Sequence, residues 1–208
     1  MRQAVRYLIA AVIWCVAVSP ACAAEIHEAA KSGDIARVKA LLDKNITLLT
    51  LKDDIGKTPV HWAVGRGQPE VLKLLLDTYK ADPNIRNNNG GTPLHVAASQ
   101  AQPECARILI DRGADVNART QNDSTPLHFA AFKGQSGHFA ALKILVESGA
   151  DVNARTDTGA TPLSMAVFRQ NTEIAAYLRE HGAKPGTRKG GSGMTGMGAG
   201  KGNYYLND

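Results

Sequence analysis

The chain has 208 residues, of which 44% are hydrophobic and 21% are charged, and this composition excludes an intrinsically disordered chain. The formal net charge is +5, but residues 1–23 and 186–208 carry +2 each, so the part between them carries only +1. A nearly neutral body disfavours extensive nucleic-acid binding, which requires several phosphates to be neutralised at once.

Residues 1–23 have the layout of a secretory signal peptide. The segment 1–6 is short and basic, residues 7–18 are apolar and uncharged, and small residues precede Ala24. We expect cleavage after Ala23, with cleavage after Ala24 as the alternative. A helix of residues 7–18 would span about 18 Å, whereas the hydrocarbon core of a membrane is about 30 Å thick. The sequence therefore predicts export to the bacterial periplasm and no membrane span after cleavage, with secretion or N-terminal anchoring as alternatives.

Cysteine usage follows from this cleavage. Removal of residues 1–23 takes away Cys15 and Cys22 and leaves Cys105 alone. No internal disulfide can then form, so stability must come from packing. Cys105 is expected to be a small core residue rather than a nucleophile.

A Thr-Pro motif recurs about every 34 residues and organises the middle of the chain. Its four copies are Thr58-Pro59-Val60-His61, Thr92-Pro93-Leu94-His95, Thr125-Pro126-Leu127-His128 and Thr161-Pro162-Leu163-Ser164. A second motif precedes three of them in a fixed register, as Ala81-Asp82-Pro83-Asn84, Ala114-Asp115-Val116-Asn117 and Ala150-Asp151-Val152-Asn153. Two motifs in one register indicate a structural repeat.

Each copy carries the local signals of a helix, a turn and a second helix. Threonine is a good N-cap and proline at the first helical position loses no hydrogen bond, so each Thr-Pro starts a helix. Paired alanines such as Ala97 and Ala98 permit close approach of the next helix, and glycines such as Gly134 end the helix in a left-handed turn. One such helix pair cannot bury its apolar face alone, so neighbouring units must stack.

These motifs resemble those of the ankyrin repeat over residues 25 to about 185. We count five units: a degenerate first unit from Glu25, then units that start near Asp53, Asn87, Thr120 and Thr156. The resemblance implies an all-α solenoid of stacked helix-turn-helix units with β-hairpin fingers, whose concave surface of fingers and inner helices binds protein. The predicted organisation is a signal peptide (1–23), an ankyrin-repeat domain with degenerate terminal units (24–185) and a flexible Gly-rich tail (186–208).

Three departures from the repeat pattern are expected to be local. Lys80 is an extra residue before the second motif, and residues 135–137 form an insertion in the turn of unit four, where extra length is tolerated. Asp123 occupies a position where the pattern has glycine, and aspartate tolerates the left-handed conformation moderately well.

Titratable residues form no recognisable catalytic or metal site in the sequence. Four histidines at equivalent positions indicate structural hydrogen bonding, and they are His27, His61, His95 and His128. His138 and His181 are expected at the surface. We therefore predict no metal, no cofactor, no small-molecule substrate and no enzyme activity.

Two sets of equivalent positions that serve neither fold nor stacking are candidates for partner binding. A ladder of arginines that would suit carboxylates precedes the unit starts at Arg86, Arg119 and Arg155. The second set ends the first helix of its unit, at Arg66, Gln100, Lys133 and Arg169, with Phe132 and Phe168 beside the last two. Arginine and aromatic side chains often dominate interface energy, so a hot spot is predicted on units four and five, with ordinary solvated surface as the alternative.

The functional prediction is a non-catalytic scaffold that binds a protein partner in an exported compartment. A sharper alternative is an immunity or protective protein for a secreted enzyme or toxin. Binding of an anionic surface or a nucleic acid through the arginines and the basic tail has less support, because the folded body is nearly neutral.

Overall fold

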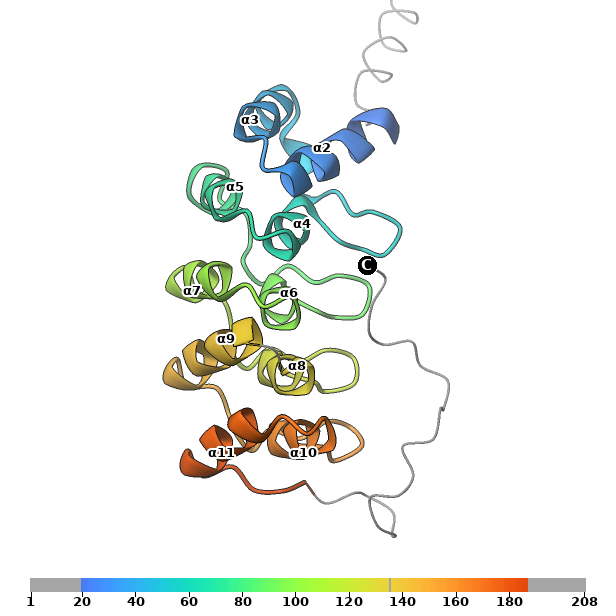
Figure 1. Ribbon diagram of the computed structural model, residues 1–208. Coiled ribbons are helices and arrows are strands. Elements are labelled where there is room, and N and C mark those ends of the chain that lie inside the picture. The colour runs from blue at the N-terminus through green and yellow to red at the C-terminus, as the bar shows by residue number, and fades with distance from the viewer. Residues whose placement is uncertain (1–19, 135, 187–208) are drawn as a thin grey trace, which may run out of the picture.

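The computed structural model describes residues 20–134 and 136–186, with side chains described from Ala24 onward. Figure 1 shows pairs of helices stacked in one direction, with loops projecting from one side. The inner helices, next to these loops, are α2 (Pro20–Ser32), α4 (Pro59–Gly65), α6 (Pro93–Ser99), α8 (Pro126–Lys133) and α10 (Pro162–Phe168). The outer helices are α3 (Ile35–Lys44) followed by η1 (Ile46–Thr50), α5 (Pro69–Lys73) continued by η2 (Leu74–Thr78), α7 (Pro103–Asp111), α9 (Ser136–Glu147) and α11 (Thr172–Glu180). The all-α repeat solenoid predicted from the sequence is confirmed.

Most of the predicted signal peptide and nearly all of the predicted Gly-rich tail lie outside the described residues. Within the described part, none of the helices is both long enough and apolar enough to cross a membrane.

The inner helices of units two to five begin at the predicted Thr-Pro pairs, and in units two to four a buried histidine joins this start to the next unit. In unit two, Nδ1 of His61 accepts a hydrogen bond from the backbone N–H of Thr58 at 3.3 Å, and Nε2 lies 3.2 Å from the carbonyl oxygen of Gly91 in the next finger. Because a carbonyl oxygen can only accept, Nε2 carries the proton and the ring is neutral. The same bonds recur from His95 to Thr92 and Ser124, and from His128 to Thr125 and Ala160. In unit five, the hydroxyl of Ser164 takes the place of the ring.

Stacking buries one continuous apolar core between the inner and outer helices. Leu94 and Leu127 on inner helices and Leu109 and Leu142 on outer helices are 0% exposed. Cys105 is 1% exposed within the same cluster, so its predicted role as a core residue is confirmed. Five stacked pairs thus bury what one pair would leave in water.

Asparagine side chains join neighbouring units below the fingers. The amide of Asn84 donates to the carbonyl oxygen of Gly113 at 3.0 Å and accepts from the N–H of Asp115 at 2.8 Å. The same two bonds run from Asn117 to Gly149 and Asp151, and from Asn153 to Gly182 and Lys184. The asparagine of the second sequence motif therefore fixes the register between successive units.

Two of the departures from the repeat pattern are absorbed locally. The end of the outer helix of unit two, η2, is a π-helix, which takes one more residue per turn and so accommodates the extra Lys80. Asp123 has a φ of 56°, which confirms the left-handed conformation expected at this position.

The fingers are closed turns, and no strand occurs in the described residues. Two backbone hydrogen bonds close each finger. The first runs from the N–H of Asp53, Asn87, Thr120 or Thr156 to the carbonyl oxygen of Lys57, Gly91, Ser124 or Ala160, and the second runs from the N–H of Gly56, Gly90, Asp123 or Gly159 back to the carbonyl oxygen of the first residue of the same finger. These bonds form no strand ladder among the described residues, so the described fingers are tight turns and their β-hairpin character stays a prediction.

His138 is 4% exposed, so the surface position predicted for it is wrong. Its Nε2 lies 3.0 Å from the carbonyl oxygen of Ser99 at the C-terminal end of α6. In other units an amide from the turn makes this backward bond, as Gln68 does to Lys31 and Asn171 does to Ala131. The insertion in unit four therefore places a histidine where other units have an amide. His181 is exposed, as predicted.

Candidate protein-binding surface

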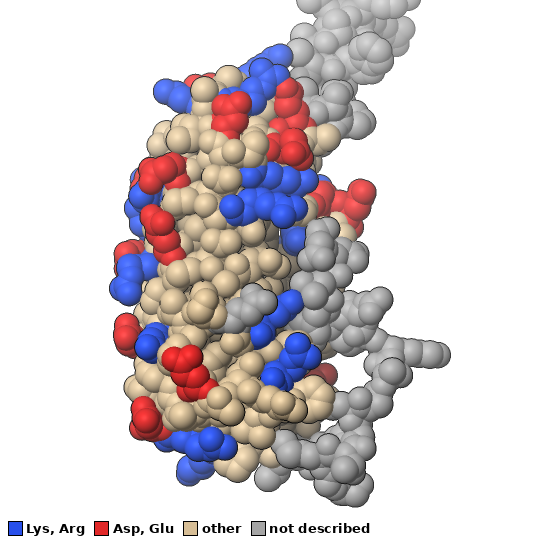
Figure 2. Space-filling model, viewed as in Figure 1, with Lys and Arg blue, Asp and Glu red and all other residues tan. Residues whose placement is uncertain are grey.

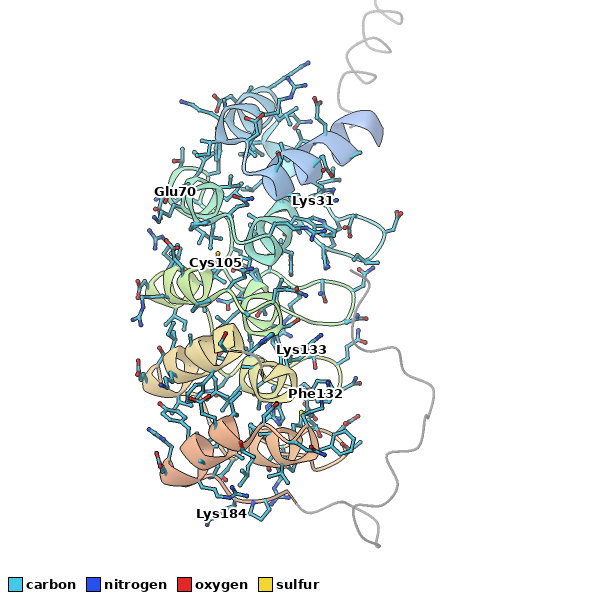
Figure 3. The ribbon with its side chains drawn as sticks, in the orientation of Figure 1. Lys31, Glu70, Cys105, Phe132, Lys133 and Lys184 are labelled. Atoms are coloured by element: carbon cyan, nitrogen blue, oxygen red, sulfur yellow. The ribbon has the colours of Figure 1, made fainter. Side chains whose placement is uncertain are left out.

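The C-terminal ends of the inner helices carry a line of basic side chains. We call Lys31, Arg66, Lys133 and Arg169 the basic column; they lie in or directly after the last turns of α2, α4, α8 and α10. The inner helices pack against one another in chain order, so these residues lie along one edge of the stack. Figure 2 shows Lys and Arg side chains along this edge, and Figure 3 labels Lys31 and Lys133 on it. Gln100 is the neutral member in unit three.

Acidic residues are absent from the inner helices α4, α6, α8 and α10 and from the described turns that follow them. The acids of units two to five lie instead in the fingers, the loops and the outer helices. There they meet cations, as in the ion pairs between Glu70 and Lys73 at 2.8 Å and between Asp77 and Arg112 at 2.5 Å. The hydrogen bond from Arg112 lowers the pKa of Asp77. Arg66, Lys133 and Arg169 of the basic column therefore have no carboxylate on their own inner helices, whereas Lys31 pairs with Glu28 on α2 at 3.2 Å.

The predicted hot-spot residues of units four and five lie together. The guanidinium carbon of Arg169 is 4.6 Å from the ring centroid of Phe132, and Lys133 follows that phenylalanine at the end of α8. Phe168 is 44% exposed and the neighbouring Val167 is 41% exposed. An exposed apolar side chain beside cations is typical of a protein-binding surface.

The predicted arginine ladder lies on the fingers, and the side chains of Arg86 and Arg119 join each finger to the next. Arg86 donates to the carbonyl oxygens of Gly90 and Arg119, at 2.9 and 2.5 Å. Arg119 in turn donates to the carbonyl oxygen of Arg155 at 2.9 Å and lies 3.9 Å from a carboxylate oxygen of Asp123. Donors held by backbone carbonyls are not free for a partner's carboxylate. The ladder therefore has a structural role, because it links neighbouring fingers, although its side chains remain exposed.

Trp62 is a candidate residue that the sequence analysis missed. The Nζ atoms of Lys31 and Lys57 lie 4.1 and 4.3 Å from its ring centroid, and the guanidinium of Arg66 lies 6.0 Å away. The indole N–H donates to Asp53 at 2.8 Å, which fixes the ring orientation. The available signal was the place of Trp62 in the motif, directly after the histidine, where other units have smaller side chains or phenylalanine.

The buried titratable groups have pKa values that suit a structural role. Burial lowers the pKa of His61, His95 and His128 to about 4, so these rings are neutral at physiological pH and add no charge to the surface. Burial raises the pKa of the Cys105 thiol to about 11, which leaves almost no nucleophilic thiolate. No group of three or more potential metal-ligating side chains occurs among residues 20–134 and 136–186.

Comparison with models of known protein families gives a match. A family model described as ankyrin repeats (3 copies) matches residues 26–120 and 114–189. The two matches together cover the stacked units and well over half of the chain. No curated protein matches the sequence.

Proposed function

The chain belongs to the ankyrin-repeat family, and from this we propose that it is a non-catalytic scaffold that holds a protein partner on its fingers and inner helices in an exported compartment. Ankyrin repeats are in general protein-interaction modules. A stack of short units offers an extended face that a partner can contact without any chemical step.

The observation that best supports the binding surface is the contact of Arg169 with Phe132, together with the exposed Phe168 next to Arg169 along the chain. Phe168 leaves 44% of its surface in water, which costs free energy unless a partner covers it. The guanidinium of Arg169 lies over the ring of Phe132, and this contact orders both side chains before binding. Little further side-chain entropy of this chain is therefore lost when a partner binds them.

The test combines cross-linking with truncation of these rings. The double variant Phe132→Ala with Phe168→Ala is expected to weaken binding of a cross-linked partner by at least about 2 kcal/mol, because it removes the apolar anchors. Phe139→Ala is the matched control, since this ring packs on Tyr177 between outer helices, with ring centroids 5.5 Å apart. Urea unfolding of all variants separates lost contacts from lost fold. Equal affinity of the double variant and the parent would rule out this surface.

The proposed compartment is the periplasm, on the basis of the signal-peptide layout of residues 1–23. Mass spectrometry of the protein recovered from fractionated cells is expected to find a chain that begins at Ala24. An intact N-terminus in the membrane fraction would support anchoring, recovery from the medium would support secretion, and recovery of the intact chain from the cytosol would contradict export.

A further inference from the structure

We infer that the partner contributes an acidic segment with apolar side chains, which lies along the basic column from Trp62 in unit two to Phe168 in unit five. This inference rests on the proposed scaffold function and specifies its partner and its surface. It adds the Trp62 cluster of Lys31, Lys57 and Arg66 as a second contact point, separate from the phenylalanines of units four and five.

The sign of the partner's charge follows from the separation of acids and bases on the stack. Three members of the column, Arg66, Lys133 and Arg169, make no ion pair with any carboxylate among the described residues. In Figure 2 the outer-helix side shows Asp, Glu, Lys and Arg intermixed, whereas basic side chains prevail over the inner helices below the uppermost unit, where acidic side chains lie beside them. A partner with carboxylates at these points gains attraction on approach and meets no like charge from the inner helices α4, α6, α8 and α10.

The few acids near the Trp62 cluster are already engaged. Glu28 forms an ion pair with Lys31 at 3.2 Å. One carboxylate oxygen of Asp53 accepts the indole N–H, and the other accepts the backbone N–H groups of Ile55 and Lys57. With its oxygens satisfied in this way, Asp53 fixes the orientation of the ring, and Arg66 beside the ring makes no ion pair with a carboxylate among the described residues.

Two members of the column, Arg66 and Arg169, each pair with an aromatic ring. Arg66 lies over Trp62, and Arg169 lies over Phe132. A guanidinium that stacks on a ring keeps its N–H donors at its edge, where they can bind a carboxylate in bidentate fashion. The ring beside it supplies apolar surface for a neighbouring side chain of the same segment. This combination suits a peptide that carries both acidic and apolar residues.

The length of the segment follows from the packing of the helices. Neighbouring packed helices lie about 8–10 Å apart, so the three steps from α4 to α10 cover about 24–30 Å. An extended peptide of about eight or nine residues spans this distance. Ser99 and Gln100 occupy the middle of the path in unit three and are uncharged. The segment is therefore expected to carry its acids towards its two ends.

A protein segment fits this surface better than a single-stranded nucleic acid. Stacking of aromatic rings with cations also suits bases and phosphates, but a nucleic acid carries a charge at every nucleotide and requires a continuous basic groove. The column has a neutral gap at unit three, and the body carries little net charge. The separate carboxylates of an acidic peptide match the separate cations of the basic column better than a regular row of phosphates does.

The test titrates the full chain with a defined probe. Trp14 and Trp62 are the two tryptophans, so Trp14→Phe makes the fluorescence of Trp62 a direct reporter of its cluster. The probe is a peptide of about twelve residues with glutamates at both ends and leucines between them. The same peptide with lysines in place of glutamates, and a thymidine oligonucleotide of equal length, are run in parallel. We expect a change in Trp62 emission with the acidic peptide only.

Charge reversal locates the probe on the column. The double variant Arg66→Glu with Arg169→Glu is expected to bind the acidic peptide at least about tenfold more weakly, because two attractions become repulsions. Arg107→Glu with Arg179→Glu is the matched control, since both arginines are exposed on outer helices and the change in net charge is the same. Equal losses in the two double variants would mean that only net charge matters and would overturn the inference. Tighter binding of the oligonucleotide than of the acidic peptide would overturn it as well.

Cross-linking in the native compartment separates this inference from the proposed function. If the parent captures a partner and the column variant captures it equally well, the scaffold function stands and the acidic segment is refuted. If the column variant loses the partner while the outer-helix control keeps it, both are supported. If the parent captures no protein, the scaffold function fails, and the peptide titration alone decides whether the column binds acidic segments.

Discussion

Acidification from about pH 8 to about pH 5 is expected to destabilise the fold through the buried histidines that join the units. His61, His95 and His128 each use Nδ1 as an acceptor and Nε2 as a donor to a backbone carbonyl, which only the neutral ring can do. Their pKa is about 4 in the folded chain, whereas an exposed histidine has a pKa of about 6.5. As the pH falls through this interval, the unfolded chain takes up protons that the folded chain excludes.

The size of the effect follows from this difference in pKa. A histidine with these two values loses about 2 kcal/mol of unfolding free energy between pH 8 and pH 5, so three lose about 6 kcal/mol. A domain of ordinary stability has about 5–15 kcal/mol in total. The contribution is complete above pH 6.5 and is lost progressively towards pH 4. Asp77 does not mask it, because its lowered pKa keeps that carboxylate ionised throughout this interval.

Urea unfolding monitored by circular dichroism at several pH values measures this loss. Near pH 5 the free energy of unfolding should fall by about 3.5 kcal/mol per pH unit, which corresponds to nearly three extra protons on the unfolded chain. In His95→Gln this slope should be about one third smaller, because one titrating ring is removed. Equal urea midpoints at pH 8 and pH 5 would show that the rings titrate normally within the fold and would refute the reasoning.

Three further predictions concern packing and backbone conformation. Leu94→Ala should lower the free energy of urea unfolding by about 2–5 kcal/mol, because Leu94 is fully buried, and a midpoint equal to the parent's would contradict the packing of the stack. Asn117→Ala should cost about 1–2 kcal/mol through loss of its two bonds to the next unit, and an unchanged melting temperature would argue against them. Gly134→Ala should cost more than Gly113→Ala, although both have positive φ, because only the Cβ at Gly134 would displace the side chain of Asn171, whose amide donates to the carbonyl oxygen of Ala131; equal melting temperatures would refute this contact.

The repeat could be predicted from the sequence because its rules are local and recur in every unit. The Thr-Pro starts and the equivalent histidines depend on neighbours within three or four residues along the chain. The left-handed conformation of Asp123 was predictable for the same reason, since its position relative to the Thr-Pro motif fixes the turn. Because each local motif occurs in several units, each copy supports the same structural prediction independently.

The parts that sequence reasoning missed depend on contacts between units. The cations around Trp62 come from three separate elements, because Lys31 ends α2, Lys57 lies in a finger and Arg66 follows α4. Residues that come from three separate elements form no recognisable motif in the sequence. His138 was placed at the surface because an insertion interrupts the register there, and only the stack shows that the ring reaches back to Ser99.

The arginine ladder was predicted as a carboxylate-binding site for a similar reason. Equivalent spacing of Arg86, Arg119 and Arg155 shows that the side chains align, but not what they contact. In the structure the next finger supplies backbone carbonyls within reach of Arg86 and Arg119. Equivalent positions in a repeat therefore show which side chains lie in line with one another, but they do not show which groups those side chains bind.

The bonds between units have a consequence for how such a chain can change its length. At the finger side, histidine and asparagine side chains such as His61 and Asn84 form hydrogen bonds with the next unit along the chain. At the turn side, Gln68, His138 and Asn171 form hydrogen bonds with the preceding unit. Both kinds of bond end on main-chain groups, which every unit possesses whatever its side chains are. An interface of this kind accepts any neighbour of the same backbone shape. Duplication or loss of a whole unit would therefore lengthen or shorten the binding face without a new junction, while substitutions in the basic column alter recognition independently.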